Sequence, residues 1–365
     1  MTGVSPDSRT VAVGMSGGID STVAAWLLKE KGYRVVGLTM KIWDDSIACD
    51  AVRSGCYGPG EAADIADARR AADRLGIEHH VVDLCGEYGG TVLDYFSGEY
   101  SEGRTPNPCV VCNSRIKFGS LIAKARSAGI AFDLFATGHY ARVSCDGRTG
   151  RHLLLRGADP SKDQSYFLHR LTQGQLAGVL FPLGGYRKEE VKAMARAAGF
   201  AEYIDKRESQ DFLEWDHYGT LLKEPVRPGD IVDTAGKVIG RHRGIAFYTV
   251  GQRRALGLAG MKEPFYVLAI NAGRNEVVAG PRKHLFSDHL LATDVNWIIP
   301  FEKRSFPEVA AKIRSTAATS RCGLFPEPDG TVEVVFADPQ ESITPGQSVV
   351  FYAGDVVIGG GVIER

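Results

Sequence analysis

No run of apolar residues in the 365-residue sequence is long enough to cross a bilayer. The first ten residues also lack the basic start and apolar stretch of a secretory signal. We therefore expect a cytoplasmic protein without membrane contacts. An excess of positive charge is missing too, because the formal net charge is -1. Any binding of nucleic acid must then depend on local basic patches.

A disulfide framework is not expected, because the chain has an odd number of cysteines, seven, and no export signal. Free thiols, metal ligands and catalytic sulfur remain as roles for them. For Cys85, Cys145 and Cys322 the default expectation is a small buried apolar side chain. The spacing of the remaining cysteines therefore carries the information.

Strand and helix patterns alternate over the first part of the chain. Apolar or β-branched runs predict strands at residues 11–15, 33–42, 79–84 and 132–137, and helical spacing predicts helices at residues 22–31, 61–75 and 188–198. This alternation indicates an α/β domain with a parallel sheet covered on both faces. A hairpin is expected at residues 140–156.

After about Arg207 the pattern changes to short extended segments separated by glycine-containing turns. Alternating apolar residues at 331–336 and 348–352 predict strands. The last third of the chain is expected to form a small β-barrel or sandwich.

The segment from Ser16 to Ser21 reads SGGIDS and lies between the first predicted strand and the first predicted helix. Gly17 and Gly18 allow backbone N–H groups to approach an anion, and the helix adds its positive end. The two serines can donate hydrogen bonds to phosphate, whereas Asp20 would repel phosphate and is expected to hold Mg²⁺. A lone glycine pair would more often be a simple turn, but here the loop, the strand and the helix agree.

This loop resembles that of ATP pyrophosphatases, which cleave ATP between the α and β phosphates and transfer AMP to an oxygen. The motifs of γ-phosphate kinases and of nicotinamide dehydrogenases are both missing from the chain. Adenylation converts a carbonyl oxygen, such as the C2 oxygen of uridine, into a group that a nucleophile can displace. The loop alone does not identify that nucleophile.

Cys109 and Cys112 lie in the segment TPNPCVVCN, just before a helix expected at residues 114–128. Cys112 would then sit at the positive end of the helix near Arg115 and Lys117, which would lower the pKa of its thiol. A thiolate there could carry a persulfide. A structural zinc pair is the alternative, but zinc needs two further ligands and the chain has no second pair at matching spacing.

Several separate blocks of the sequence resemble the tRNA-specific 2-thiouridylase family. They are GMSGGIDS at Gly14, TPNP at Thr105, ATGHY at Ala136, KDQSY at Lys162, YTVGQRR at Tyr248 and TPGQ at Thr344. The blocks are spread over nearly the whole chain. The resemblance implies an ATP-pyrophosphatase domain at residues 1–207, a small β-rich central domain at residues 208–284 and a C-terminal β-barrel at residues 285–365.

The same resemblance implies the roles of individual residues. ATP contacts are implied for Gly14, Met15, Ser16, Gly17, Gly18, Ile19, Asp20, Ser21, Met40 and Gly138. Contacts with tRNA are implied for Asn107, Pro108, Cys109, His139, Lys162, Asp163, Gln164, Arg314, Ser315 and Gln347. Cys112 is the implied catalytic sulfur residue, and the implied partners are tRNA and a sulfur donor such as a cysteine desulfurase or a sulfur-relay protein.

Two departures from the family pattern concern the sulfur chemistry. Many members have an aspartate where this chain has Cys109, and the family's second catalytic cysteine corresponds to Leu213. Leucine cannot carry sulfur, so the usual relay between two cysteines cannot use that position. Our hypothesis is that another thiol substitutes, with Cys109 as the first candidate and Cys56, in a loop after the second strand, as another.

Three thiolates, from Cys56, Cys109 and Cys112, could instead hold a [4Fe–4S] cluster with one open iron for sulfide. The sequence therefore leaves a persulfide and a cluster mechanism open. It also leaves open an ATP pyrophosphatase acting on another acceptor, and a non-catalytic relative that binds tRNA or a sulfur carrier.

Overall fold

The computed structural model describes residues 9–45, 47, 55–206, 211–215, 218–258, 260–261, 263–301 and 308–364. The chain divides into two compact units. The first contains Met1–Thr91, Cys109–His217 and Asp355–Val357, and the second contains Val92–Pro108, Tyr218–Gly354 and Ile358–Arg365. The domain limits expected at residues 207 and 284 stay a prediction.

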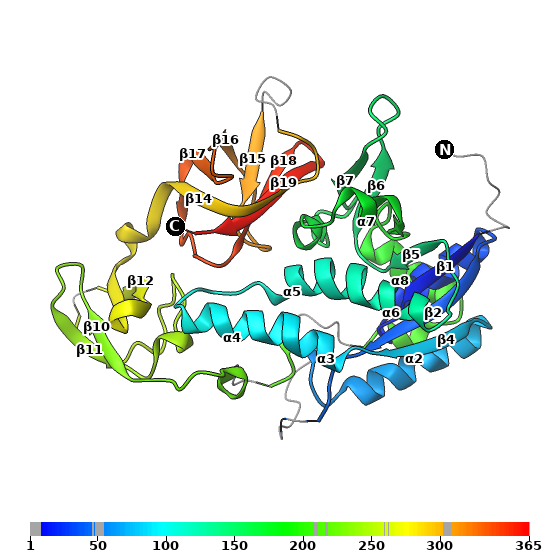
Figure 1. The fold of residues 1–365 in the computed structure, drawn as a ribbon, viewed down its shortest axis with the longest axis horizontal. Coiled ribbons are helices and arrows are strands. Elements are labelled where there is room, and N and C mark those ends of the chain that lie inside the picture. Colours follow the sequence, from blue (N-terminus) through cyan, green and yellow to red (C-terminus); the bar gives the residue numbers. More distant parts are fainter. Residues whose placement is uncertain are drawn as a thin grey trace. The chain divides into compact units, whose positions relative to one another are not determined.

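A five-stranded parallel sheet forms the centre of the first unit (Figure 1). Its order is β4-β2-β1-β5-β8, with β1 at Thr10–Gly14, β2 at Arg34–Lys41, β4 at Glu78–Asp83, β5 at Leu134–Thr137 and β8 at Val179–Leu180. In the middle strand, Val11 pairs with Val35 on one side and Leu134 on the other. The predicted α/β fold with a parallel sheet is confirmed.

The helices α1 (Ile19–Glu30), α2 (Glu61–Leu75) and α8 (Lys188–Ala197) bury an apolar stripe in one core with this sheet. The first unit also contains α3 (Cys85–Tyr88), α7 (Gln173–Ala177), η4 (Ser165–Leu168) and η5 (Ala201–Tyr203). Val23 and Leu27 of α1 and Ala68 and Ala71 of α2 recur at helical spacing and lie in one core with the strands. The helices expected from periodicity at residues 22–31, 61–75 and 188–198 are all present.

The helix that carries the cysteine pair begins earlier than expected. It runs through α5 (Pro108–Val111), η3 (Cys112–Ser120) and α6 (Leu121–Ser127), and η3 is a π-helix. Pro108 occupies the first position of α5, where its missing N–H costs no hydrogen bond. Cys109 therefore lies in the first turn and Cys112 follows the first turn, which corrects the expected start at residue 114.

A two-stranded parallel sheet of β3 (Gly55–Tyr57) and β9 (Asp211–Leu213) also belongs to the first unit. Gly55 pairs with Asp211 and Tyr57 pairs with Leu213. Ser209 and Gln210, which precede β9, lie outside the described residues. The sequence patterns did not predict this sheet.

The expected hairpin is present as β6 (Ala141–Cys145) and β7 (His152–Arg156), and Leu154 and Leu155 of β7 also pair with Val357 and Val356. Cys145 is exposed on β6, whereas Cys85 and Cys322 are partly buried. The expectation of a buried side chain was therefore wrong for Cys145. It is the last residue of β6, next to the turn that joins the two strands.

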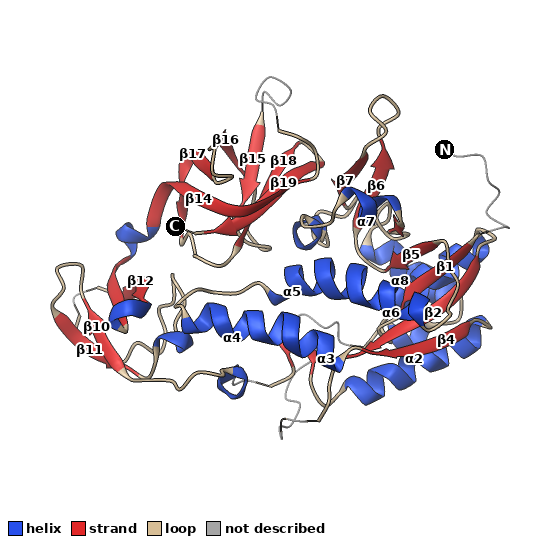
Figure 2. Ribbon diagram, viewed as in Figure 1, coloured by secondary structure: helices blue, strands red, loops and turns tan. Residues whose placement is uncertain are grey.

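In the second unit, a four-stranded sheet has the order β11-β10-β13-β12 (Figure 2). These strands are β10 (Gly229–Val232), β11 (Val238–His242), β12 (Phe265–Asn271) and β13 (Glu276–Pro281), and the neighbouring helical segments are η2 (Gly89–Leu93), α4 (Asp94–Ser101), η6 (Tyr218–Leu221), η7 (Ile245–Phe247), η8 (Ala272–Arg274) and η9 (Arg282–Leu285). Ile231, Val267 and Val277 form the centre of its small core.

The last strands of the second unit close into a β-barrel. They are β14 (Phe286–Trp297), β15 (Val309–Lys312), β16 (Ser320–Pro326), β17 (Val332–Glu341), β18 (Ser348–Ala353) and β19 (Val356–Ile363). The order is β14-β17-β16-β15-β18-β19, and β14 also pairs with β19, for example through Ala292 and Ile363. This closure decides between the barrel and the sandwich in favour of the barrel.

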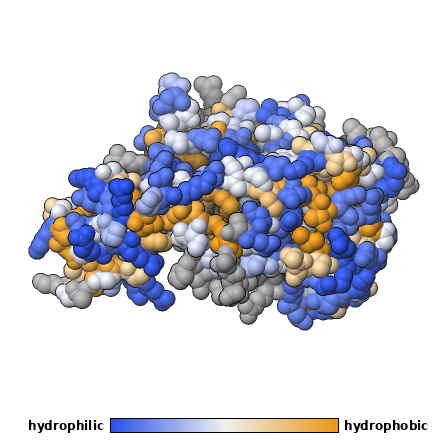
Figure 3. All heavy atoms as spheres, turned by 60° about the horizontal axis from the view of Figure 1, so that its bottom comes forward, coloured by the Kyte–Doolittle hydropathy of each residue, from blue (hydrophilic) through white to orange (hydrophobic). Residues whose placement is uncertain are grey.

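Hydrophilic side chains cover most of the face drawn in Figure 3, and apolar residues appear between them as separate patches. Over the part of the chain that the structure describes, no helix is both long and apolar enough to span a membrane.

Candidate active site

The phosphate loop connects β1 to α1 and is closed by its own serines. Ser21 Oγ accepts from the backbone N–H of Ser16 at 3.2 Å and donates to the carbonyl oxygen of Gly18 at 3.1 Å. The two serine hydroxyls are 3.4 Å apart. Because α1 begins at Ile19 with Gly18 as its N-cap and no side chain caps it, its first N–H groups are available to an anion.

Two glycines make this loop possible. Gly17 has φ +70°, and a Cβ there would lie 2.4 Å from the carbonyl oxygen of Asp64. Gly138 follows β5, and a Cβ there would lie 2.8 Å from the carbonyl carbon of Asp20. Any larger residue would push the loop away from α2 or from the end of β5.

Lys206 is a cation beside the phosphate loop that was not among the expected site residues. Its Nζ donates to the carbonyl oxygen of Gly17 at 3.2 Å and to carboxylate oxygens of Asp64 at 2.7 Å and Asp67 at 2.5 Å. The loop is thereby tied to α2. No local pattern marks Lys206, because its partners are about 140 positions earlier in the chain.

Asp20 lies in the first turn of α1, but its carboxylate is already engaged. Lys188 Nζ donates to both of its oxygens, at 2.7 Å and 2.8 Å, and the Tyr140 hydroxyl donates at 2.7 Å. A role for Asp20 in holding Mg²⁺ stays a prediction, and the ion would compete there with Lys188. No local pattern indicates this pair, because Lys188 begins a helix far along the chain.

Met40 lies near the carboxyl end of β2, the edge at which parallel sheets bind ligands. Next to it, Thr39 Oγ1 donates to the carbonyl oxygen of Met15 at 2.7 Å. Glu61, at the start of α2, accepts from the backbone N–H of Ile42 at 2.7 Å. Burial raises the pKa of the Glu61 carboxyl against the opposing effect of these backbone hydrogen bonds. The two contacts fix the backbone on either side of Met40.

Three thiols and one ammonium group form an interacting cluster in the first unit. Burial, followed by the influence of Cys56 and Cys112, raises the pKa of Cys109 to about 12. Burial also raises the pKa of Cys112 to about 11, although Lys117 opposes this. All three thiols in turn raise the pKa of Lys117, outweighing the effect of its own burial.

The lowered pKa expected for Cys112 is therefore corrected. Cys112 is 9% exposed and does not lie at the helix N-terminus, so desolvation of the thiolate exceeds the attraction of Lys117. Arg115, the other expected cation, is exposed. Lys117 is the cation that interacts with the thiols.

The thiol cluster does not have the arrangement of a metal site. Among the described residues, which leave out Cys49, no group of three or more histidine, cysteine, aspartate or glutamate side chains could hold an ion. The described thiols thus fit neither a structural zinc ion nor the [4Fe–4S] cluster that the sequence left open. We assign no step to either.

His139 follows Gly138 and lies next to the same cluster. Its Nδ1 is 2.6 Å from Thr137 Oγ1, and its ring packs against Phe118 and Phe181. Burial, with the neighbouring charge of Lys117, lowers the pKa of His139 to about 3. The side chain is therefore a neutral imidazole near the thiols.

Asp163 and Gln164, which are expected to contact tRNA, also form hydrogen bonds that hold a turn. Asp163 accepts hydrogen bonds from the backbone N–H groups of Gly157 and Ser165, both at 3.0 Å. Gln164 Oε1 accepts from the N–H of Tyr140 at 2.9 Å. Lys162 lies in the same turn, where its backbone N–H donates to Asp159. A role for these residues in tRNA binding stays a prediction.

Other expected tRNA contacts lie in the second unit. Gln347 Nε2 donates to the carbonyl oxygens of Thr105 and Pro106 at 3.1 Å and 3.0 Å, and thus joins two of the sequence blocks. The backbone N–H of Asn107 donates to the Tyr95 hydroxyl at 3.0 Å, and Asn107 and Pro108 are buried. Gln347 is thereby engaged within the protein.

Arg314 and Ser315 follow β15. Arg314 is exposed and donates to the carbonyl oxygen of Glu341 at 2.9 Å, and Ser315 is half-buried. Their proposed contact with tRNA is not tested by these interactions.

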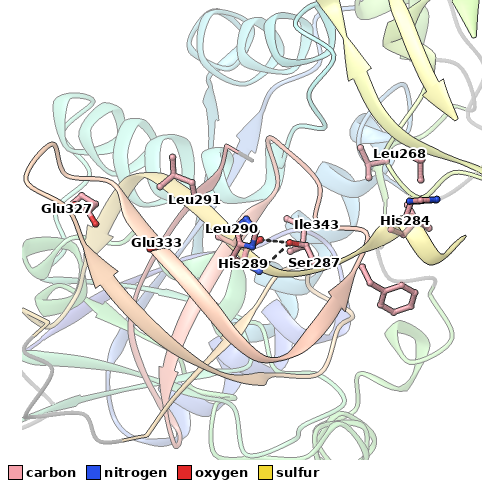
Figure 4. A pocket seen from close by; sticks show the side chains of 12 residues that line it. Leu268, His284, Ser287, His289, Leu290, Leu291, Glu327, Glu333 and Ile343 are labelled. Atoms are coloured by element: carbon pink, nitrogen blue, oxygen red, sulfur yellow. Dashed lines mark hydrogen bonds between the residues drawn. The ribbon is translucent and has the colours of Figure 1, made fainter. Parts of the chain in front are cut away.

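A pocket of about 630 Å³ opens in the second unit (Figure 4). Its lining includes His284, His289, Glu327 and Glu333, and His289 is held by Ser287. None of the residues expected to bind ATP, sulfur or tRNA lines it. The pocket therefore shares no lining residue with the phosphate loop or the thiol cluster.

Three family models match successive stretches of the chain. They are the tRNA methyl transferase HUP domain at residues 9–213, the tRNA methyl transferase PRC-barrel domain at residues 221–281 and the aminomethyltransferase beta-barrel domain at residues 287–363. The phosphate loop and the thiol cluster both fall within the first match. Fold and site thus define a HUP-domain protein with a nucleotide loop and a cysteine site.

Curated relatives identify the family within that class. The tRNA-specific 2-thiouridylase MnmA of Endomicrobium trichonymphae is 46% identical over 356 residues, which are 97% of this chain and 98% of the relative. The MnmA of Geotalea uraniireducens is 47% identical over 363 residues, with 98% and 95% coverage. The chain belongs to the tRNA-specific 2-thiouridylase family, and the resemblance of its sequence blocks is confirmed.

Solved structures add little to this assignment. The NMN synthetase from Francisella tularensis aligns with 56% of this chain and 67% of its own at 19% identity and a TM-score of 0.33.

Proposed function

We propose that this protein is a tRNA-uridine 2-sulfurtransferase that uses ATP to replace the C2 oxygen of the wobble uridine with sulfur. One observation carries the proposal: the phosphate loop and the cluster of interacting thiols belong to the same compact unit. The chain that contains them is a member of the 2-thiouridylase family. The loop supports ATP binding, and the thiols support sulfur transfer.

The adenylation step follows from the anion-binding loop. The N–H groups at the start of α1 and the hydroxyls of Ser16 and Ser21 would bind phosphate oxygens. The C2 oxygen of uridine would attack the α-phosphorus and release pyrophosphate, which leaves the base with AMP as a leaving group. ATP enters as its Mg²⁺ complex, and Asp20 can contribute to holding the ion only by leaving Lys188.

The sulfur step uses Cys112. A persulfide on Cys112 would attack C2 of the adenylated base and expel AMP. Lys117 lies beside this thiol and favours its negatively charged form. His139, a neutral imidazole, would contribute polarity without adding a second positive charge.

The partners in this proposal are tRNA and a donor of persulfide sulfur, such as a cysteine desulfurase or a sulfur-relay protein, in the cytoplasm. Asn107, Pro108, Cys109, His139, Lys162, Asp163, Gln164, Arg314, Ser315 and Gln347 remain the proposed tRNA-binding residues. Several of them also hold the fold, as the contacts of Gln164 and Gln347 indicate. Their substitution is therefore expected to affect stability as well as tRNA binding.

The test is reaction of the purified protein with ATP, Mg²⁺, unmodified tRNA and a persulfide donor, followed by mass spectrometry of the tRNA nucleosides. The wild type should form 2-thiouridine and release AMP and pyrophosphate, and Cys112→Ala should form no 2-thiouridine. Pyrophosphate release driven by a small acceptor without tRNA would favour another substrate. Binding of tRNA without ATP turnover would favour a non-catalytic role.

A further inference from the structure

Cys56 is placed on the strand next to the position where the family's second catalytic cysteine is missing. β3 carries Cys56 between Gly55 and Tyr57, and these two neighbours pair with Asp211 and Leu213 of β9. The residues are separated by more than 150 positions in the chain, but the two strands are adjacent. Cys56 on β3 therefore lies beside the position on β9 where this chain has Leu213 in place of a cysteine.

The contact between the two strands is closely packed. A Cβ at Gly55 would lie 2.6 Å from the carbonyl carbon of Leu213, so only glycine allows this approach. On the other side of Cys56, Glu214 accepts from the N–H of Gly60 at 2.7 Å and donates its own N–H to the carbonyl oxygen of Tyr57 at 3.2 Å. These contacts fix the position of β3.

Aromatic rings cover the buried face of the two strands. The Tyr57 ring lies 6.0 Å from Trp215, 4.9 Å from Trp43 and 5.4 Å from Tyr88 between centroids. Because side chains alternate along a strand, Cys56 points to the opposite face from Tyr57. The exposure agrees, since Tyr57 is 2% exposed and Leu213 is 5% exposed whereas Cys56 is exposed.

Cys56 also lies near the other thiols of the cluster. Cys56 influences the ionisation of Cys109, Cys112 and Lys117, so all four groups share one neighbourhood. Leu213 pairs with Tyr57 and is buried with it. Of the two paired strands, β3 therefore carries the thiol and β9 carries a buried leucine.

We propose that Cys56 is the resolving thiol of sulfur transfer and provides the second thiol that this chain lacks at the position of Leu213. This inference rests on the proposed function. It replaces Cys109, the first candidate from sequence spacing, with a thiol that only the pairing of β3 and β9 brings into place.

After attack of the Cys112 persulfide, the base is linked to Cys112 through an S–S bond and AMP has left. The Cys56 thiolate attacks Sγ of Cys112, so that a Cys56–Cys112 disulfide forms and the S–S bond to the base breaks. The electron pair leaves with 2-thiouridine, which is released as its thiolate and takes up a proton. A dithiol reductant then returns two electrons to the disulfide before the next turnover.

Cys109 is less suited to this step. It is partly buried, and its pKa of about 12 leaves little thiolate near neutral pH. It also lies one helical turn from Cys112 within the same helix, in α5 and η3. Cys56 lies on a separate strand, β3, and its side chain is exposed.

The test is a single turnover without reductant, using persulfide-loaded protein, ATP, Mg²⁺ and tRNA. Cys56→Ser should release AMP once per enzyme and then accumulate a covalent protein–tRNA adduct on Cys112, which dithiothreitol converts to free 2-thiouridine. Cys145→Ser, at an exposed thiol of the hairpin, should accumulate no adduct and behave as wild type.

A second measurement covers a Cys56→Ser variant that fails to fold. Peptide mapping of the wild type after one turnover should find a Cys56–Cys112 disulfide. A Cys109–Cys112 disulfide, or release of 2-thiouridine by Cys56→Ser without reductant, would overturn the inference. A wild type that forms no 2-thiouridine at all would instead overturn the proposed function.

Discussion

Lys188 places its ammonium group 2.7 Å and 2.8 Å from the two carboxylate oxygens of Asp20. Lys188 is 7% exposed in its side chain and Asp20 is 27% exposed, so the pair is largely withdrawn from water. It joins the start of α8 to the first turn of α1, directly behind the phosphate loop. The pair therefore contributes both to the stability of the first unit and to the position of that loop.

We predict that Lys188→Met lowers the free energy of unfolding of the first unit by about 2 kcal/mol or more, because Asp20 loses both of its lysine hydrogen bonds in a partly buried place. Lys192→Met, in the same helix, removes only an exposed contact with Glu189 and should change stability by less than about 0.5 kcal/mol. Urea unfolding followed by tryptophan fluorescence measures both. Equal losses in the two variants would contradict the prediction.

Much of the fold was predictable because it depends on local patterns. The run from Val11 to Val13 is buried on both faces of the sheet, and α2 repeats buried alanines at helical spacing. Such patterns predict a strand or helix wherever one of its faces is buried in the core. The phosphate loop was equally visible, because its glycines and serines act on one another within a few residues.

The parts that the sequence did not reveal depend on long-range contacts. β3 and β9 are three residues each, too short to show a period, and their pairing relies on Gly55 and on the packing of Tyr57. The ionisation of Cys112 was misjudged because helix position was estimated locally, whereas burial depends on the whole unit. Likewise, Lys206 meets the loop only in the folded chain.

Gln175 connects α7 to the π-helix that carries Cys112. Its Nε2 donates to the carbonyl oxygens of Ser114 and Phe118, both at 2.9 Å, and its Oε1 accepts from the N–H of Thr172 at 2.9 Å. Gln175→Glu keeps an acceptor for the Thr172 cap but removes both donations. We expect a loss of about 1–3 kcal/mol in stability.

The same variant should slow the sulfur step more than AMP formation, because the π-helix positions Cys112 and not the phosphate loop. Comparing 2-thiouridine and AMP after one turnover measures this difference. If Gln175→Glu lowers both products equally, the hydrogen bonds hold the fold alone and have no specific effect on the thiol.

His139 predicts a pH dependence of stability. Because burial lowers its pKa to about 3 from the ordinary value of 6.5, the unfolded chain binds a proton between these values that the folded chain does not. Stability should therefore fall as the pH decreases from 6.5 towards 3, by up to about 1.4 kcal/mol per pH unit from this group. His139→Gln should flatten the curve of unfolding free energy against pH. Parallel curves for the two proteins would show that His139 does not contribute.

Alkylation of Cys112 should be slow at neutral pH and increase towards pH 11, because burial raises the pKa of its thiol to about 11. Lys117→Met removes the cation that lowers this pKa, so alkylation should become slower at every pH below that value. Mass spectrometry of iodoacetamide-treated protein gives the rate, with the exposed Cys145 as an internal reference for reagent access. A plateau reached below pH 9, or faster alkylation of Lys117→Met, would contradict the assignment of the shift.

The phosphate loop gives the last prediction. Gly17→Ala places a Cβ 2.4 Å from the carbonyl oxygen of Asp64, at a φ of +70° that costs alanine about 1–3 kcal/mol. The loop must move away from α2, which also stretches the contact from Lys206 to the Gly17 carbonyl oxygen. ATP-dependent release of AMP should therefore fall by at least about tenfold, the equivalent of 1.4 kcal/mol.

Gly147→Ala, on the hairpin turn with no atom within 4 Å of its added Cβ, should leave AMP release unchanged. If Gly17→Ala kept wild-type AMP release with tRNA, nucleotide activation would have to occur elsewhere, because a displaced loop could not keep its N–H groups in hydrogen-bonding geometry with the same phosphate oxygens.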